Sequence, residues 1–171
     1  ACPKHYALNS IENIRFSVNV ESDDTALREV YLPHFKKCID AGAMSIMGAY
    51  NLFRGDHCCE SKYLLTDILR NEWGFDGFVI SDFIMGVHNA QKALKAGLDI
   101  EMPITMHYAL LPALLKMKKI SINDIDKAVD NILAGLIKIT PKIQSKDKSV
   151  ICCKEHTQLA KEASIEGTVL L

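Results

Sequence analysis

The sequence lacks a long apolar run, an excess of charge of one sign and a glycine-rich phosphate-binding loop. Its most apolar stretches, around Phe78–Ser81 and Tyr108–Leu115, are far shorter than the roughly 18 to 20 residues of a membrane-spanning helix. The 20 Lys and Arg residues balance 21 Asp and Glu residues and form no basic stripe, which argues against nucleic acid. Without a G-x-G-x-x-G or Walker-type loop, nucleotide binding is not expected either. We therefore expect neither a membrane nor a nucleic-acid partner.

The sequence has six cysteines but no C-x-x-C pair. A chain of 171 residues that is 49% hydrophobic can build a core without disulfide staples, so we expect reduced thiols. Only His57-Cys58-Cys59 and Cys152-Cys153-x-x-His156 approach the ligand spacing of a zinc site. We predict no metal site and no cofactor.

The two ends of the sequence resemble those of a piece cut from a longer protein. It begins at Ala1 with neither an initiator Met nor a signal-peptide pattern, and it ends in the apolar run Thr168–Leu171. The composition is that of a soluble globular unit, and we expect it in the cytoplasm, or in the periplasm or outside the cell, of a bacterium.

Apolar residues at three- and four-residue spacing predict a series of helices. Pro33 should kink the first of them, and Ser121 and Asp124 resemble a capping box before the fifth. The expected helices span residues 24–41, 63–72, 87–96, 108–118, 122–139 and 153–166. Residues 141–149 are rich in Lys and lack apolar periodicity, which indicates a linker.

Short apolar runs between these helices predict buried strands over residues 43–50, 77–82 and 98–102, besides a segment that ends at Lys4-His5. Strands alternating with helices require parallel pairing, so the fold class is α/β. Each strand delivers a polar or ionisable residue to its end, which favours a (β/α)8 TIM-type barrel over a doubly wound sheet. Four strands correspond to half of such a barrel.

Asp82 is the first candidate for chemistry. It follows the apolar strand Phe78–Ile80, so its carboxylate lies at the edge of a water-poor core and could act as a nucleophile or a general base. Alternatively, Asp82 only caps the following helix.

Lys4 and His5 form a second candidate, because donors at a strand end can bind the hydroxyls of a polar ligand. Alternatively, they belong to a solvated terminus. Asp99 and Glu101 alternate along a strand and face the same way, and one of them is expected to be structural, held by Arg or by backbone N–H groups.

Several motifs in one order make the sequence resemble the family 3 glycoside hydrolases, the β-glucosidase group. The match extends from the first residues to Glu162–Leu171, which resembles the entry to that family's second domain. The segments that carry the resemblance are Lys4–Ala7 with Asn9, Glu12 and Arg15, then Leu27–Phe35, Met47–Asn51, Leu64–Asp82 and Ala96–Met102.

The resemblance implies that residues 1–140 form strands five to eight of an N-terminal (β/α)8 barrel, and that residues 141–171 are a linker and first helix leading to an α/β sandwich domain. It implies retaining hydrolysis with Asp82 as the nucleophile. Lys4 and His5 would bind sugar hydroxyls. The motif residues Met47 and Tyr50 would lie in the substrate site, and Phe83 would replace the Trp that often follows the nucleophile.

In the resembled family, the acid/base residue comes from the domain after the barrel. The resemblance therefore implies a retaining exo-glycosidase of the β-glucosidase or β-xylosidase type, acting on an oligosaccharide or on an aryl or alkyl glycoside. The isolated chain is expected to be inactive, because it lacks half of the barrel and the sandwich domain. The alternatives are a catalytically silent carbohydrate-binding or structural barrel fragment and, more remotely, a Schiff-base aldolase that uses Lys4.

Overall fold

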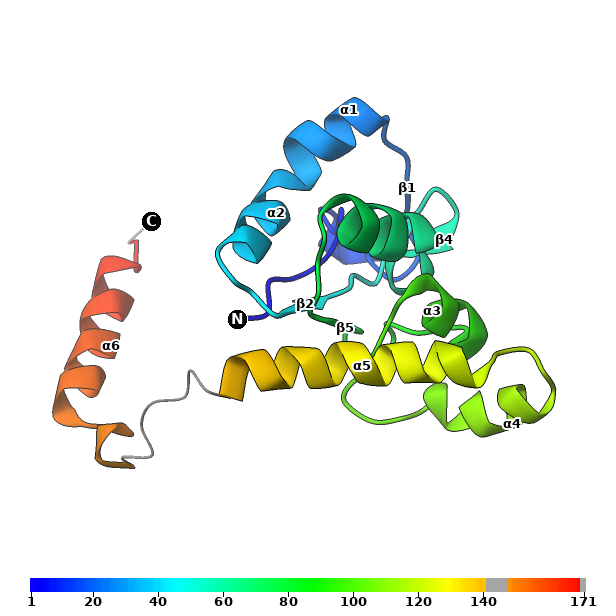
Figure 1. The fold of residues 1–171 in the computed structure, drawn as a ribbon. Coiled ribbons are helices and arrows are strands. Elements are labelled where there is room, and N and C mark those ends of the chain that lie inside the picture. Colours follow the sequence, from blue (N-terminus) through cyan, green and yellow to red (C-terminus); the bar gives the residue numbers. More distant parts are fainter. Residues whose placement is uncertain (141–147, 170–171) are drawn as a thin grey trace. The chain divides into compact units, whose positions relative to one another are not determined.

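A computed structural model of the chain describes residues 1–140 and 148–169. The contacts divide the chain into two compact units, one over Ala1–Thr140 and one that begins at Pro141. The first unit contains every strand of the described residues, together with most of the helices (Figure 1).

The first unit is a mixed α/β structure built on a small parallel sheet. Strand β2 (Ser45–Met47) pairs in parallel with β5 (Phe78–Ile80), and Ile46 lies opposite Val79. Single parallel bridges extend this pairing from Gly48 to Tyr6 on one side and from Ile80 to Ile100 on the other. The parallel pairing and the order of the segments agree with the prediction, but the regular strands are shorter than expected.

A second sheet forms that the sequence did not predict. It has the order β1 (Asn19–Val20), β3 (Leu52–Phe53), β4 (Asp56–His57). Strands β3 and β4 form an antiparallel hairpin whose two turn residues, Arg54 and Gly55, have φ values of 50° and 85°. Two left-handed turn residues match the right-handed twist of a two-residue hairpin. The sequence does not predict this turn, because Arg54 occupies the first turn position, where Asn or Asp is typical.

The first expected helix is interrupted at its proline. Helix α1 (Asp24–Ala26) begins at the Asp23 cap, whose side chain accepts the Ala26 N–H, and continues into the π-helical turn Leu27–Tyr31. Leu32 ends that turn, and α2 (Pro33–Asp40) starts with its proline in the first helical position. Proline is favoured there because its missing N–H has no partner inside the helix. The predicted kink is therefore a break.

The helix Tyr63–Glu72 forms where it was predicted, with π-helical hydrogen bonding, between the short 3-10 turn Cys58–Glu60 and β5. After β5, α3 (Ala90–Ala96) begins three residues later than expected, because Asn89 caps it by accepting the Lys92 N–H. Gly97 ends α3 with a φ of 107°, a left-handed conformation that favours glycine.

Two helices complete the first unit. A 3-10 turn (Tyr108–Leu110) leads into α4 (Leu111–Lys116), which is shorter than predicted. Helix α5 (Ile122–Ile139) has the predicted bounds and capping box: the Ser121 hydroxyl accepts the Asp124 N–H, and the Asp124 carboxylate accepts the Ser121 N–H. Further short 3-10 turns span Glu12–Ile14 and Lys148–Val150.

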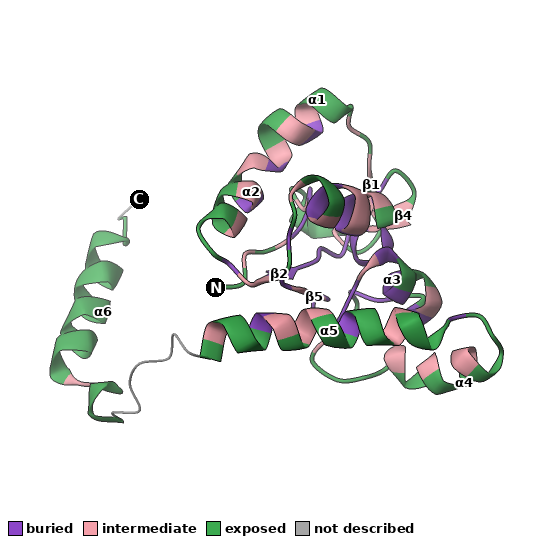
Figure 2. Cartoon of the chain, in the orientation of Figure 1, coloured by how far each residue is buried: buried purple, intermediate pink, exposed green. Residues whose placement is uncertain are grey.

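The second unit contains the last predicted helix, α6 (Lys154–Glu166), whose residues are all exposed (Figure 2). Most of the linker predicted over residues 141–149 lies outside the described residues. None of the helices in the described ranges combines the length and apolar character needed to cross a bilayer.

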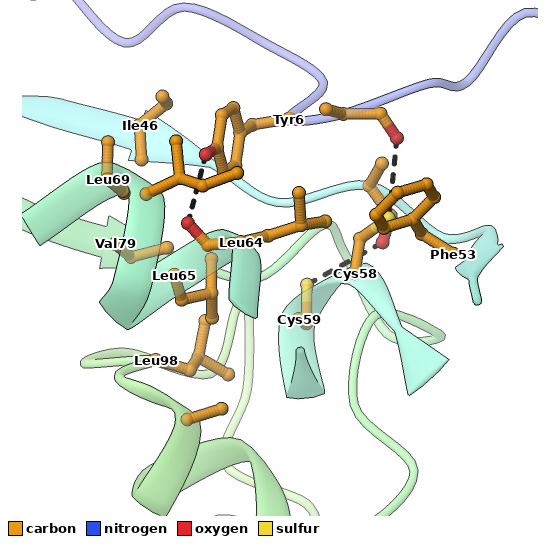
Figure 3. Packing of buried hydrophobic residues seen from close by; sticks show 14 of the residues in the cluster. Tyr6, Ile46, Phe53, Cys58, Cys59, Leu64, Leu65, Leu69, Val79 and Leu98 are labelled. Carbon is orange, nitrogen blue, oxygen red and sulfur yellow. Dashed lines mark hydrogen bonds between the residues drawn. The ribbon is translucent and has the colours of Figure 1, made fainter. Parts of the chain in front are cut away.

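The core of the first unit lies between the parallel sheet and the helix Tyr63–Glu72 (Figure 3). Ile46 and Val79, from the two paired strands, are fully buried beside Leu65. The Tyr6 hydroxyl donates to the Leu64 carbonyl at 3.0 Å, so the buried ring keeps its polar atom satisfied. This bond ties the Lys4-His5 segment to the helix layer and thereby fixes one wall of the candidate site.

Candidate functional site

The parallel register brings the ends of β2 and β5 side by side. Met47 lies opposite Ile80, so the residues three positions beyond each strand, Tyr50 and Phe83, come close together. The Tyr50 hydroxyl donates to the Phe83 carbonyl at 2.7 Å. The bridge between Tyr6 and Gly48 adds the preceding residue, His5, to the same edge. Three of the predicted site residues, His5, Tyr50 and Phe83, therefore meet around Asp82.

Asp82 is 7% exposed, and its two carboxylate oxygens differ in their partners. Oδ1 accepts the Phe83 N–H at 2.8 Å. Oδ2 is buried and has no hydrogen-bond donor among the described residues, although His5 Nε2 lies 3.2 Å away. That short contact lacks hydrogen-bond geometry. The interpretation of Asp82 as a helix cap is wrong, because Asn89 caps the following helix.

Tyr50 forms a second wall beside Asp82. Its side chain is buried, and burial raises the pKa of its hydroxyl, with the neighbouring Asp82 charge raising it further. Tyr50 therefore stays a neutral hydrogen-bond donor over a wide pH range. The Arg15 guanidinium lies 4.9 Å from the Tyr50 ring centroid and 4.9 Å from that of Phe16. Arg15 is part of the family motif, but the sequence predicts no role for it.

The remaining predicted residues lie in different surroundings. Phe83 is 46% exposed, so its ring is available as an apolar surface. Lys4 is exposed and forms no hydrogen bond or ion pair with the described residues. Met47 is buried in β2, where its carbonyl accepts the Tyr6 N–H and its N–H donates to Pro3. Of Lys4, His5 and Met47, only His5 forms an ion-pair contact with Asp82 in the described residues.

Asp99 and Glu101, at the next strand end, are both structural. Asp99 Oδ2 accepts from Arg70 at 2.6 Å and from the Val79 N–H at 2.7 Å. Glu101 accepts the backbone N–H groups of residues 106, 107 and 108 at 2.8 to 2.9 Å. The expectation that Arg or backbone donors hold one of the two is confirmed for both. Backbone donors saturate Glu101, so it has little capacity to bind a ligand.

The site is an open edge, since Phe83, which follows Asp82, and Lys4, which precedes His5, are both exposed. A separate groove of about 520 Å³ lies among the helices and is lined by Arg70, Asp99 and Asn131, but it contains neither Asp82 nor His5. Within residues 1–140 and 148–169, no group of three or more His, Cys, Asp or Glu side chains could hold a metal ion. All six cysteines are free thiols.

Known proteins resemble both the sequence and the fold. The chain is 38% identical over 176 residues to thermostable beta-glucosidase B of Acetivibrio thermocellus, which covers 100% of this chain and 23% of that protein. It is 40% identical over 187 residues to the beta-glucosidase BoGH3A of Bacteroides ovatus, covering 100% of this chain and 25% of the relative. The chain thus spans about a quarter of the length of these curated relatives.

The same similarity appears among solved structures. The crystal structure of a Bifidobacterium adolescentis beta-glucosidase superposes with a TM-score of 0.84 at 31% identity, over 99% of this chain and 25% of that one. The model of the glycosyl hydrolase family 3 N-terminal domain matches residues 3–134. Because this match covers most of the sequence, and the relatives match it end to end, the chain belongs to glycosyl hydrolase family 3.

Proposed function

We propose that the chain is part of a retaining exo-acting glycoside hydrolase of the β-glucosidase or β-xylosidase type, with Asp82 as its nucleophile. The observation that carries the proposal is the Asp82 carboxylate: it is buried, held at Oδ1 by the Phe83 N–H, and left without a donor at Oδ2. Because the hydrogen bond at Oδ1 holds the carboxylate in place, Oδ2, which has no hydrogen bond, is free to bond to a substrate carbon.

The chemistry requires this arrangement. As the bond from the anomeric carbon to the leaving oxygen breaks, positive charge develops on that carbon. The Asp82 Oδ2 electron pair forms the new carbon–oxygen bond of a glycosyl-enzyme, while a second carboxyl group gives the leaving oxygen its proton. Water then breaks the ester bond and passes a proton back to that second group. The net result is hydrolysis with retained configuration.

The neighbours of Asp82 have supporting roles. His5 Nε2, 3.2 Å from Oδ2, is close enough to donate to a sugar hydroxyl beside the carboxylate, and Lys4 adds an exposed cation to the same segment. Tyr50 lies against the loop that carries Asp82, and the exposed Phe83 ring offers an apolar surface to a sugar face. We place Met47 in the substrate site only through the family motif.

The proposal includes a larger parent protein. The order of the parallel segments, Tyr6, β2, β5 and Ile100, suits strands five to eight of a (β/α)8 barrel over residues 1–140. Residues 141–171 would then be a linker and first helix leading to an α/β sandwich domain. The acid/base carboxyl would come from that domain, so the isolated chain would be inactive. The substrate would be an oligosaccharide or an aryl or alkyl glycoside.

Product stereochemistry in the complete parent protein tests the proposal. Proton NMR of the first sugar released from an aryl β-glucoside and an aryl β-xyloside should show the β-anomer before mutarotation, because two displacements retain configuration. Release of the α-anomer would contradict a nucleophilic Asp82. Binding of these glycosides without hydrolysis would instead support the catalytically silent alternative.

A further inference from the structure

Glu60 is a buried carboxylate that the proposed chemistry does not use. It ends the 3-10 turn Cys58–Glu60, is 4% exposed, and lies between β4 and the helix Tyr63–Glu72. Its Oε1 accepts two backbone N–H groups, those of His88 and Asn89, each at 2.7 Å. A carboxylate taken from water into this position needs such donors, and both come from the loop that follows Asp82.

The loop from Asp82 to Asn89 has a conformation that needs external support. Ile84 has a φ of 65°, a left-handed conformation that β-branched residues rarely adopt. Gly86 packs so closely that an added Cβ would lie 2.4 Å from the Asp82 carbonyl oxygen. Such strained segments persist only where surrounding contacts fix them. The Ile84 N–H donates to the Met102 carbonyl at 3.0 Å, and this hydrogen bond is one of these contacts.

The turn Cys58–Glu60 holds this loop at the end farther from Asp82, where the Glu60 carboxylate accepts the N–H groups of His88 and Asn89. The turn is itself anchored, because the Cys58 N–H donates to the Asn51 backbone carbonyl at 3.0 Å. A displacement of the Glu60 carboxylate would therefore release the far end of the loop.

We infer that Glu60 is a positioning residue for Asp82: by binding the N–H groups of His88 and Asn89 it fixes the loop that aims the Asp82 carboxylate. This inference rests on the proposed function, since it concerns the rate at which Asp82 attacks. Val87, which is 1% exposed, packs into the core between Gly86 and His88 and transmits the restraint along the loop.

The test compares variants of the complete parent protein in the first turnover of an activated dinitrophenyl β-glycoside. The burst rate constant of phenol release reports the attack by Asp82, and the burst amplitude counts intact sites. In Glu60→Ala the acceptor of both N–H groups is lost, and we expect the rate constant to fall about 10- to 100-fold while the amplitude per folded protein is kept. In Glu60→Gln an oxygen remains to accept both N–H groups, and the rate constant should return to within about threefold of the wild type.

Asp124→Ala is the matched control. Asp124 also accepts a backbone N–H, that of Ser121 at 2.8 Å, but it lies at the start of α5. Its loss should lower the melting temperature without changing the burst rate constant. If Glu60→Ala does not fold, Glu60→Asp provides the same test, since it withdraws the carboxylate by one methylene and should slow the burst about three- to tenfold.

The outcomes separate the two proposals. A wild-type parent that forms no covalent intermediate would overturn the proposed function itself. A wild-type burst together with an unchanged rate constant in Glu60→Ala, whatever its amplitude, would overturn the positioning role, because a merely structural residue reduces the number of intact sites and not their rate. The same holds for an unchanged rate constant in Glu60→Asp.

Discussion

Two buried aspartates at the ends of neighbouring parallel segments have opposite surroundings. Asp82 is 7% exposed and Asp99 is 6% exposed. Asp99 Oδ2 accepts hydrogen bonds from the Arg70 guanidinium and the Val79 N–H, and Oδ1 accepts one from the Asn131 amide at 2.8 Å. Asp82 receives a single backbone N–H, and its Oδ2 has no donor among the described residues.

On the proposed mechanism, the difference separates a structural carboxylate, Asp99, from the nucleophile, Asp82. Burial raises the pKa of Asp99 above its usual value, and Arg70, Asn131 and the Val79 N–H offset only part of that rise. Its three partners come from three elements, so Asp99 joins the helix Tyr63–Glu72, β5 and α5. The Asp82 side chain accepts the N–H of the next residue and lies 3.2 Å from His5 Nε2, but it accepts no hydrogen bond from a helix or strand in the described residues. A carboxylate with such weak structural ties is retained for chemistry more readily than for stability.

Replacing Asp82 is the strongest way to test this contrast. In the parent protein, Asp82→Ala should lower turnover of an activated aryl β-glycoside by several orders of magnitude, because no route to the covalent intermediate remains. Steady-state kinetics and a melting curve on the same sample check the prediction, and folding should survive. Retention of a tenth or more of the activity would remove Asp82 from the mechanism.

Replacing Asp99 should have the reverse effect. Asp99→Ala leaves the Arg70 guanidinium, 17% exposed at its side chain, without its carboxylate partner. Breaking one side of a buried pair costs roughly 3 to 5 kcal/mol, so we expect a loss of this size in the free energy of unfolding.

Urea denaturation of the parent protein measures that loss. Asp126→Ala is the control, since Asp126 is exposed on α5 and its replacement should change stability by less than about 0.5 kcal/mol. If Asp99→Ala were as stable as this control, the structural assignment of Asp99 would be wrong.

Replacing Lys4 and His5 tests whether the surroundings of Asp82 bind substrate, as those of Asp99 do not. Lys4→Ala and His5→Ala should each lower kcat/KM of the parent by about ten- to a thousandfold, since a lost contact to a sugar hydroxyl involves a charged or donor-rich group. His5→Ala should have the larger effect, because only His5 contacts Asp82. A deoxy-sugar substrate that suffers the same mutational loss as the hydroxylated one would exclude a contact to that hydroxyl.

The smallest expected effect is a pH dependence at Glu101. Burial raises the pKa of Glu101, but the N–H groups of residues 108, 107 and 106 and the His107 ring lower it more, so the pKa in the folded protein lies below 4.5. A carboxylate with a lowered pKa stabilises the fold above its unfolded value, and this stability is lost as the pH falls through the folded value.

Unfolding in urea between about pH 3 and 6 measures this effect. The stability of the wild type should fall below about pH 4.5 more steeply than that of Glu101→Gln, which cannot ionise. Parallel curves for the two proteins would show that Glu101 does not supply the acid-sensitive stability.

The sequence predicted the elements whose signals are local. Helix α5 has a long apolar periodicity and a capping box, and both bounds match. The predicted start of α3 at Val87 is three residues too early. Val87 fits the helical spacing of apolar residues, but it is a buried residue of the loop that precedes the Asn89 cap. The β3–β4 hairpin was missed because its Arg54-Gly55 turn has no sequence signal as strong as Asn-Gly.

The candidate site followed the same rule. Strand ends and a family motif predicted Asp82, His5, Tyr50 and Phe83, since parallel strands bring their ends to one edge. Glu60 could not be found in this way, because its partners are backbone groups of a loop 28 and 29 residues later. Its role depends on a loop path that no periodicity encodes.

The most direct test of the central claim is to identify the residue that becomes covalently attached to the sugar. The parent protein is treated with an activated fluorosugar that forms the glycosyl-enzyme quickly and releases it slowly, and the digested protein is analysed by mass spectrometry. The account predicts that the sugar mass is found on the peptide that contains Asp82, at Asp82 itself, and is absent from Asp82→Ala. Labelling of Asp99, Glu101 or another carboxylate in an active parent protein would contradict it.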